Sequence, residues 1–258
     1  MAFFLPIAHF ALPTILSKGM ETSETPTVFS RQQFLDMVLR LRPQVAAFDC
    51  DGTLWSGDAG ETFFDWEIRR GVVSPEIGKA MRARYAEYKA GKVSEDDMCG
   101  EMVTMHKGLS DAAVMDAATQ FMQSAFPGRV FPEMCELVRQ LRDQGCEIWA
   151  VSSSNEWVIR AGIDQFGIPH DRILAAKVEL DQGVVSDRLV RVPSGPGKPK
   201  ALREVVRKNI HAAFGNSKWD IDMLSEAKHA FAINPNPDLK DIARRRGWTI
   251  YFPDGIRR

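Results

Sequence analysis

Two aspartates separated by one residue are the side chains best placed to do chemistry. Asp49 and Asp51 directly follow the apolar run 45–48, and Gly52 comes next. This pattern predicts a strand that delivers both acids at its end. Two close carboxylates repel each other unless a positive charge lies between them, and a hard divalent cation commonly supplies it. The alternatives are an Asp-Gly turn or a calcium loop, but the further acids of a calcium loop are absent.

Two later segments suit an anion. The apolar run 148–151 ends in Ser152 and Ser153, whose hydroxyls and following helix amides form a natural cradle. Serines that only cap a helix are the alternative. Lys198 stands at the start of a predicted helix, where a lysine opposes the helix dipole, so an anionic partner is implied. A solvated surface lysine is the alternative there.

Oxygen ligands also follow a third apolar run. Asn216 and Asp220 come just after the strand expected at 211–214. In a parallel sheet, ligands bind outside the carboxyl ends of the strands. We therefore expect these side chains and Asp49 to converge on one crevice.

The pattern along the rest of the chain divides into a helical block and an alternating block. A helix at 30–42 precedes the first strand, and four helices at 63–70, 74–90, 94–106 and 110–124 follow it. Strands are then expected at 147–151, 172–175, 211–214, 230–233 and 248–251. The helices between and around them are expected at 132–144, after 155, and at 198–208, 221–227 and 238–245.

This alternation predicts an α/β fold, a Rossmann-like parallel sheet with helices on both faces and an inserted α-helical cap. Residues 28–58 and 126–258 would form the catalytic core, and 59–125 the cap. Residues 1–27 are expected to be disordered or loosely packed. The apolar start, interrupted by Pro6 and Pro13, is at most a weak export signal.

Composition excludes several function classes. The chain has 258 residues and a formal net charge of -1, so nucleic acid and stable membrane association are disfavoured. Its four cysteines show no metal spacing, which favours a reducing, cytoplasmic setting over export. The oligomeric state is left open.

Taken together, the segments resemble the haloacid dehalogenase superfamily, whose four motifs occur here in order. Lys198 matches the third motif better than Lys200 because Leu202 follows it at the family's spacing. The motifs are Asp49-x-Asp51-Gly-Thr-Leu, Ser152, Lys198 and Gly215-Asn216-Ser217-x-x-Asp220.

The resemblance implies a role for each residue. Asp49 would attack phosphorus and form an aspartyl-phosphate, and Asp51 would protonate the leaving oxygen. A Mg²⁺ ion would be held by Asp49, the backbone carbonyl of Asp51 and an oxygen of Asn216 or Asp220. The phosphoryl oxygens would bind Ser152, Ser153 and Lys198. Asp51 also distinguishes phosphatases from haloacid dehalogenases proper.

One position departs from the family pattern. Asn216 stands where the family has an acid, and a neutral ligand weakens the electrostatic attraction for a metal. Asp220 or Asp222 would have to compensate. The alternative of another class is a binding protein that keeps the fold and has lost turnover.

The segment 88–109 resembles the cap of the phosphoserine phosphatase branch. On that alignment the arginine expected to bind the substrate carboxylate falls at Met102, and a thioether cannot form a bidentate clamp. Arg82 or Arg84 would have to reach in from another turn. Phosphoserine is therefore the second choice of substrate.

Trp55 and Glu61 also resemble phosphorylcholine phosphatase relatives, in which such an acid faces a cationic head group. Glu101 is a second acidic candidate, and aromatic rings can bind ammonium groups. The alternatives are aromatic side chains of the core and a glutamate that favours a helix start. The prediction is a Mg²⁺-dependent phosphomonoester hydrolase acting on a small organic phosphate that bears an amine or ammonium group, such as phosphocholine or phosphoethanolamine.

Overall fold

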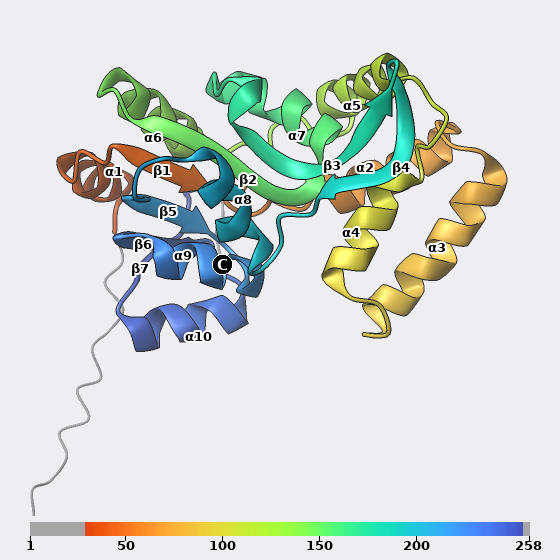
Figure 1. The fold of residues 1–258 in the computed structure, drawn as a ribbon. Helices are drawn as coiled ribbons and strands as arrows, with labels where there is room; N and C mark the ends of the chain where they lie inside the picture. Colours follow the sequence, from red (N-terminus) through yellow and green to blue (C-terminus); the bar gives the residue numbers. More distant parts are fainter. Residues whose placement is uncertain (1–28, 255–258) are drawn as a thin grey trace, which may run out of the picture.

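The computed structural model describes residues 29–254, whose elements are labelled in Figure 1. The predictions for residues 1–27 concern a segment outside this range. Within it, no helix is both long enough and apolar enough to cross a bilayer.

The described strands form one seven-stranded sheet in the order β4-β3-β2-β1-β5-β6-β7. Neighbouring strands are parallel except for β3 and β4. Because β1 is central, the residues that follow it emerge in the middle of the sheet edge. The strands are β1 (Val45–Phe48), β2 (Glu147–Asn155), β3 (Ile173–Asp181), β4 (Val184–Arg191), β5 (Ala212–Gly215), β6 (His229–Ile233) and β7 (Thr249–Tyr251).

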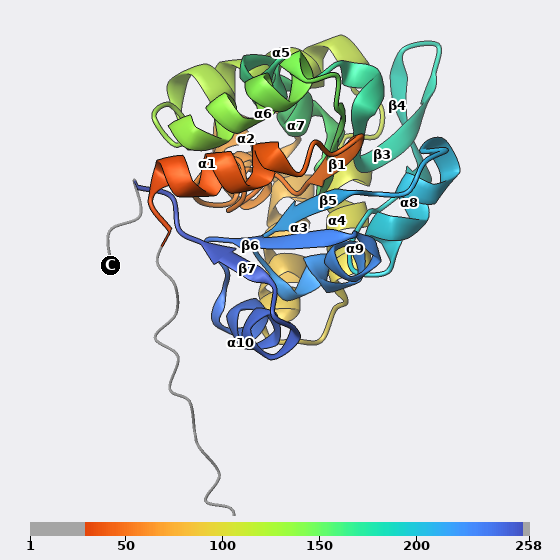
Figure 2. The ribbon, with the colours of Figure 1, turned by 90° about the vertical axis from the view of Figure 1, so that its left-hand side faces the viewer.

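Alternate residues of β1 serve two separate cores, as period 2 requires. Ala46 and Phe48 face the larger cluster, and Val45 and Ala47 face the smaller one. Figure 2 shows the helices on the two faces of the sheet. On one face are α1 (Arg31–Arg40), α6 (Pro132–Asp143) and α7 (Glu156–Ile163), and on the other α8 (Gly197–Val205), α9 (Ile221–Glu226) and α10 (Pro237–Arg246). The predicted α/β class is confirmed.

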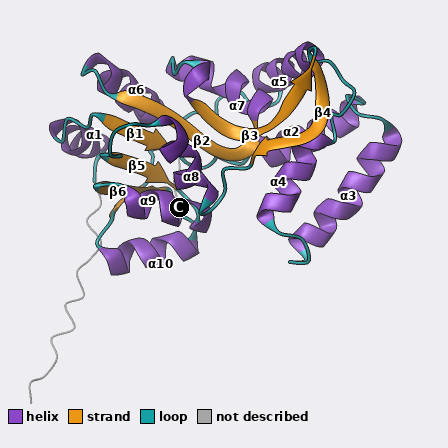
Figure 3. Cartoon of the chain, in the orientation of Figure 1, coloured by secondary structure: helices purple, strands orange, loops and turns teal. Residues whose placement is uncertain are grey.

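The sheet is parallel as predicted except at one edge. No strand was expected at Val184–Arg191, yet β4 forms an antiparallel hairpin with β3. The loop residues Gln182 and Gly183 have φ of 51° and 82°. Positive φ at both central residues of a two-residue loop matches the twist of a hairpin. Figure 3 shows the tip of the hairpin beside α5, where the amide of Asp111 donates to the carbonyl of Gly183 at 2.8 Å.

Four helices lie between β1 and α6 in the chain: α2 (Ala59–Arg70), α3 (Pro75–Lys89), α4 (Glu95–Thr104) and α5 (Asp111–Ser124). Each begins after a side-chain N-cap, at Asp58, Ser74, Ser94 and Ser110. Helices α2 to α4 share a small cluster of their own, whereas the buried face of α5 joins the main core. We propose that residues 59–125 form a cap on a core made by the rest of the described chain.

Candidate active site

The turn after β1 brings two distant motifs into contact. The amide of Asp49 still donates to the carbonyl of Phe214 on β5, at 2.9 Å. Gly52 then adopts φ of 74°, and a Cβ there would lie 1.7 Å from Nδ2 of Asn216. Only glycine fits both the backbone conformation and this close approach.

Lys198 joins two buried carboxylates. Its ammonium donates to Oδ1 of Asp49 and to Oδ1 of Asp220, both at 2.6 Å, and to the carbonyl of Val151 at 3.1 Å. The Lys198 side chain is 2% exposed. Burial lowers the pKa of Lys198, but the two carboxylates outweigh this effect and raise it, so the lysine stays charged.

Asp220 has donors on both of its oxygens. Oδ1 accepts from Lys198, while Oδ2 accepts from the amides of Asn216 and Ser217, both at 2.9 Å, and from the Ser217 hydroxyl at 3.2 Å. This geometry makes Asp220 a support for Lys198. It disfavours the prediction that Asp220 is a direct metal ligand, because its oxygens are already occupied by donors.

The carboxyl group of Asp51 accepts three hydrogen bonds. Oδ1 accepts from the indole of Trp55 at 2.7 Å and from the amide of Ala59 at 2.6 Å, and Oδ2 accepts from the Ser154 hydroxyl at 2.7 Å. Burial and the nearby charge of Asp58 raise the pKa of Asp51 to about 7 despite these donors. A carboxyl with such a pKa can carry a proton near neutral pH.

Asp49 has a different environment. Its second oxygen accepts from the Thr53 hydroxyl at 2.8 Å. Burial and the charge of Asp220 raise the pKa of Asp49 to about 6, against the opposing effect of Lys198. Burial therefore raises the pKa of both acids of the first motif, and what distinguishes Asp49 is its direct contact with the ammonium of Lys198.

A cleft of about 370 Å³ opens over these groups. It brings together most of the site residues expected from the sequence and adds several that were missed. Expected residues on its wall are Asp49, Asp51, Ser152, Ser153, Lys198 and Asn216, together with Ser154 of the same serine run; additional ones are Asp58, Tyr88, Glu95 and Trp219. Of these, Glu95 and Asp58 could be seen in the sequence only as ordinary helix-start residues.

The donor set of the cleft fits Mg²⁺, which accepts few carboxylates together with neutral oxygens and water. Asp49 and the amide of Asn216 line the cleft with the Asp51 turn. Within residues 29–254, no three His, Cys, Asp or Glu side chains are arranged to hold a metal. A magnesium ion here would thus depend on one or two carboxylates and on phosphate oxygens.

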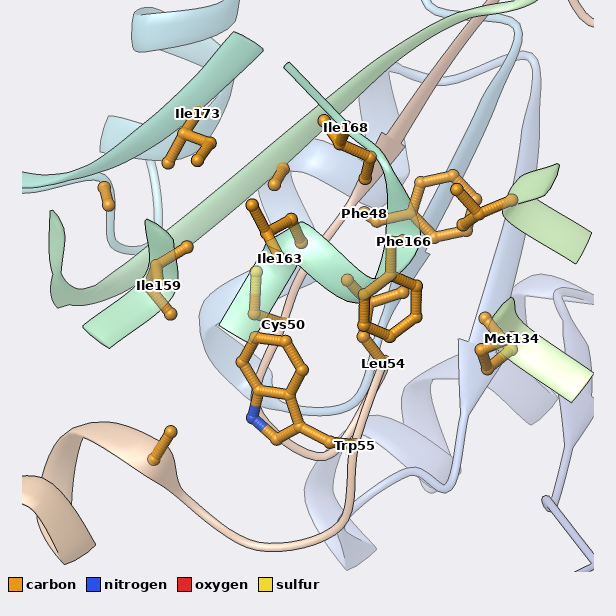
Figure 4. Packing of buried hydrophobic residues seen from close by; sticks show 14 of the residues in the cluster. Phe48, Cys50, Leu54, Trp55, Met134, Ile159, Ile163, Phe166, Ile168 and Ile173 are labelled. Atoms are coloured by element: carbon orange, nitrogen blue, oxygen red, sulfur yellow. The ribbon is translucent and has the colours of Figure 1, made fainter. Parts of the chain in front are cut away.

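Trp55 does not face the cleft. It is fully buried, with its ring edge-on to Phe126 and 6.1 Å from Phe166. Figure 4 shows the ring inside the core beside Cys50 and near Ile163. The prediction that Trp55 binds substrate is not supported by this position. The indole instead packs in the core and orients Asp51.

The two predicted acidic contacts lie in different places. Glu61 lines a small cavity of about 80 Å³ beside the cleft, where the ammonium of Lys89 is 3.3 Å from it. Glu101 forms a bidentate ion pair with Arg84 and does not line the described cavities. Its position does not favour a role in substrate binding.

The arginine alternatives can also be placed. Arg84 is held by Glu101, and Arg82 donates to Asp65 at 2.7 Å. Neither arginine lines the described cavities, whereas Met102 lines the small one. The wall near the substrate position thus has a thioether where a carboxylate clamp would need an arginine.

A strand-end aspartate held by a buried lysine, beside a second acid that can carry a proton, defines the chain as a hydrolase of the phosphatase class. Residues 46–225 match the model of the haloacid dehalogenase-like hydrolase family. The chain belongs to this family, which confirms the resemblance drawn from the four motifs.

Two proteins of similar sequence are named as phosphatases, and a solved structure has a similar fold. Phosphoserine phosphatase SerB1 of Mycobacterium tuberculosis is 25% identical over 220 residues, which cover 80% of this chain and 69% of the relative. Histidinol-phosphatase of Neisseria meningitidis is 23% identical over 217 residues, covering 80% and 97%. A solved structure of a protein of unknown function from Bordetella pertussis Tohama I has a TM-score of 0.72 at 20% identity, covering 80% and 97%.

Proposed function

We propose that this protein is a Mg²⁺-dependent phosphomonoesterase that works through an aspartyl-phosphate on a small phosphate ester bearing an amine or ammonium group. The observation that carries the proposal is the contact between Lys198 and Asp49 beside Asp51. The contact supports the proposal because a carboxylate suited to be a nucleophile, a cation and a second acid meet at one cleft.

The roles follow from charge and position. Asp49 attacks the phosphorus, and the leaving oxygen departs from the opposite side. Asp51, protonated near neutral pH, gives its proton to that oxygen. It then accepts a proton from the water that hydrolyses the aspartyl-phosphate. Lys198, with Ser152 and Ser153, holds the phosphoryl oxygens as their charge develops.

Asp49, the backbone carbonyl of Asp51 and the Asn216 amide oxygen would hold Mg²⁺. The ion would offset the repulsion between phosphate and nucleophile. Asp220 fixes Lys198 from the other side.

The charge of the wall supports the substrate class. Asp58 and Glu95 line the cleft, and Glu61 lies in the adjoining cavity. Acids around a phosphate site favour a substrate whose other end is cationic. Phosphoserine also carries a carboxylate, for which Met102 offers no partner, so phosphate esters of simple amino alcohols are favoured. The relative named histidinol-phosphatase acts, by its name, on an ester of this kind.

Hydrolysis of p-nitrophenyl phosphate with and without Mg²⁺ tests the proposal, with Asp49→Asn as the control. We expect metal-dependent turnover that the variant loses by at least about 10³-fold. Turnover no higher than that of the variant at saturating Mg²⁺ would instead support a binding protein without catalysis. The four cysteines are free in the structure, in keeping with our proposal of a reducing, cytoplasmic setting.

A further inference from the structure

Tyr88 and Glu95 form a wall shared by three cavities. Both line the catalytic cleft and the small adjoining cavity. Both also line a third cavity of about 530 Å³, between the turn that joins α3 to α4 on one side and the loop 194–196 and the short 3-10 helix Lys218–Asp220 on the other. A substrate whose phosphate reaches Asp49 would extend its other end past this wall.

Glu95 forms no ion pair within the described residues. Its carboxylate accepts a hydrogen bond from the Tyr88 hydroxyl, and Cys99 Sγ lies 3.8 Å from its other oxygen. Asp58, another acid on the cleft wall that forms none there, differs from Glu95 because its carboxylate caps α2 by accepting from the amide of Glu61 at 2.7 Å. By contrast, Glu61 is paired with Lys89, and Glu101 with Arg84. A half-buried carboxylate without a counterion attracts a cation from outside more strongly than one that is already paired.

The chain itself shows that an ammonium suits this wall. Nζ of Lys89 lies 5.0 Å from the ring centre of Tyr85 and 6.0 Å from that of Tyr88, with the Glu61 carboxylate beside it. Ring faces and a carboxylate together bind an ammonium group. Because the Glu61 carboxylate is already paired with Lys89, a substrate cation would bind at the Glu95 carboxylate instead.

We propose that Glu95, held by Tyr88, is the residue that selects substrates with a positively charged leaving group, in place of the Glu61 suggested by the sequence. The inference rests on the proposed phosphatase function. It assigns selectivity to one carboxylate on the wall that the catalytic cleft shares with the two neighbouring cavities.

The test compares phosphoethanolamine with 2-hydroxyethyl phosphate, which has nearly the same shape but a neutral hydroxyl in place of the ammonium group. We expect Glu95→Gln to lower kcat/KM for phosphoethanolamine by about 10- to 100-fold, the range of a hydrogen bond to a charged group, while 2-hydroxyethyl phosphate changes less than about threefold. Glu101→Gln, an acid on the same helix paired with Arg84, should leave the ratio of the two substrates unchanged. An unchanged ratio in Glu95→Gln would overturn the proposal.

A binding measurement separates this inference from the proposed function. Calorimetry on Asp49→Asn, with Mg²⁺ present, gives the affinities for both esters without turnover. The proposal predicts tighter binding of phosphoethanolamine and loss of that preference when Glu95→Gln is added. Equal affinities in Asp49→Asn would refute it even if the wild type is active. Charge-dependent binding without wild-type turnover would uphold the role of Glu95 and reject the phosphatase function.

Discussion

The ammonium of Lys198 lies 2.6 Å from a carboxylate oxygen of Asp49, although 149 positions separate the two residues in the chain. Lys198, at the start of α8, makes this contact just past the end of β1, and there it also donates to the carbonyl of Val151 on the neighbouring strand β2. With Asp220 on its other side, Lys198 balances only one of two buried carboxylates. The remaining negative charge is the physical reason to expect a divalent cation nearby.

Replacing Lys198 should impair both stability and activity. Lys198→Met leaves Asp49 and Asp220 buried without a counterion, which should lower the free energy of unfolding by about 3–5 kcal/mol. Turnover should be lost as well. Denaturant unfolding measures the first effect, and Lys200→Met, at an exposed position two residues away, is the control. A stability loss equal in the two variants would contradict the bridging role. Adding Asp220→Asn should restore part of the stability.

Removing a hydrogen bond to Asp51 should lower kcat/KM most for substrates whose leaving group needs a proton. Ser154→Ala removes one of the three donors to Asp51. An alkyl phosphate needs a proton on its leaving oxygen, whereas p-nitrophenolate does not. We expect kcat/KM to fall about tenfold for phosphoethanolamine, the cost of one such hydrogen bond, and less for p-nitrophenyl phosphate. The exposed Ser124→Ala serves as control. Equal losses on both esters would argue against Asp51 as the acid.

Stability should depend on pH through a buried pair between Glu67 on α2 and His106 in the turn after α4. Nε2 of His106 lies 2.7 Å from Oε2 of Glu67, and Nδ1 faces the carbonyl of Val103. Burial lowers the pKa of His106, but Glu67 outweighs it and raises the pKa above 6.5. Stability from a raised pKa is present below the unfolded value and is lost as pH rises through the folded value.

The free energy of unfolding, measured from pH 6 to about 9, should therefore fall as His106 loses its proton. Glu67→Gln removes the charge that retains this proton. The stability difference between wild type and this variant should become smaller as pH rises. If the free energies of unfolding of wild type and Glu67→Gln differ by the same amount at every pH, Glu67 does not raise the pKa of His106.

Introducing an arginine at Met102 should change substrate preference. The side chain lines the cavity beside the cleft, where a guanidinium could bind a carboxylate through two hydrogen bonds. We expect Met102→Arg to raise the kcat/KM ratio of phosphoserine to phosphoethanolamine by about tenfold or more, as one charge-assisted contact allows. Met102→Gln, similar in length and uncharged, is the control. If both variants shift the ratio equally, charge is not the cause.

The catalytic residues could be predicted because each follows an apolar run. Asp49 and Asn216 directly follow β1 and β5, and Ser152 lies in the C-terminal half of β2, so adjacent parallel strands bring these positions together. The β3–β4 hairpin was missed because its loop has Gln182 where an Asn or Asp would have signalled positive φ.

Substrate contacts were harder to predict because they depend on how helices turn towards one another. Nothing in the sequence shows that Glu101 pairs with Arg84 while Glu95 faces the cleft. The position of Trp55 was equally hard to predict, since an aromatic residue next to a motif can line a pocket or pack beneath it. Its indole contact with Asp51 emerges only from the folded turn.

Trapping the phosphorylated enzyme tests the central claim most directly. Wild-type protein mixed with radiolabelled substrate and Mg²⁺, then quenched in acid, should retain label in a bond that hydroxylamine cleaves, as an acyl phosphate requires. Asp49→Asn should retain none. Turnover by the wild type with no trapped label, or label that persists in Asp49→Asn, would contradict the account of Asp49 as the nucleophile.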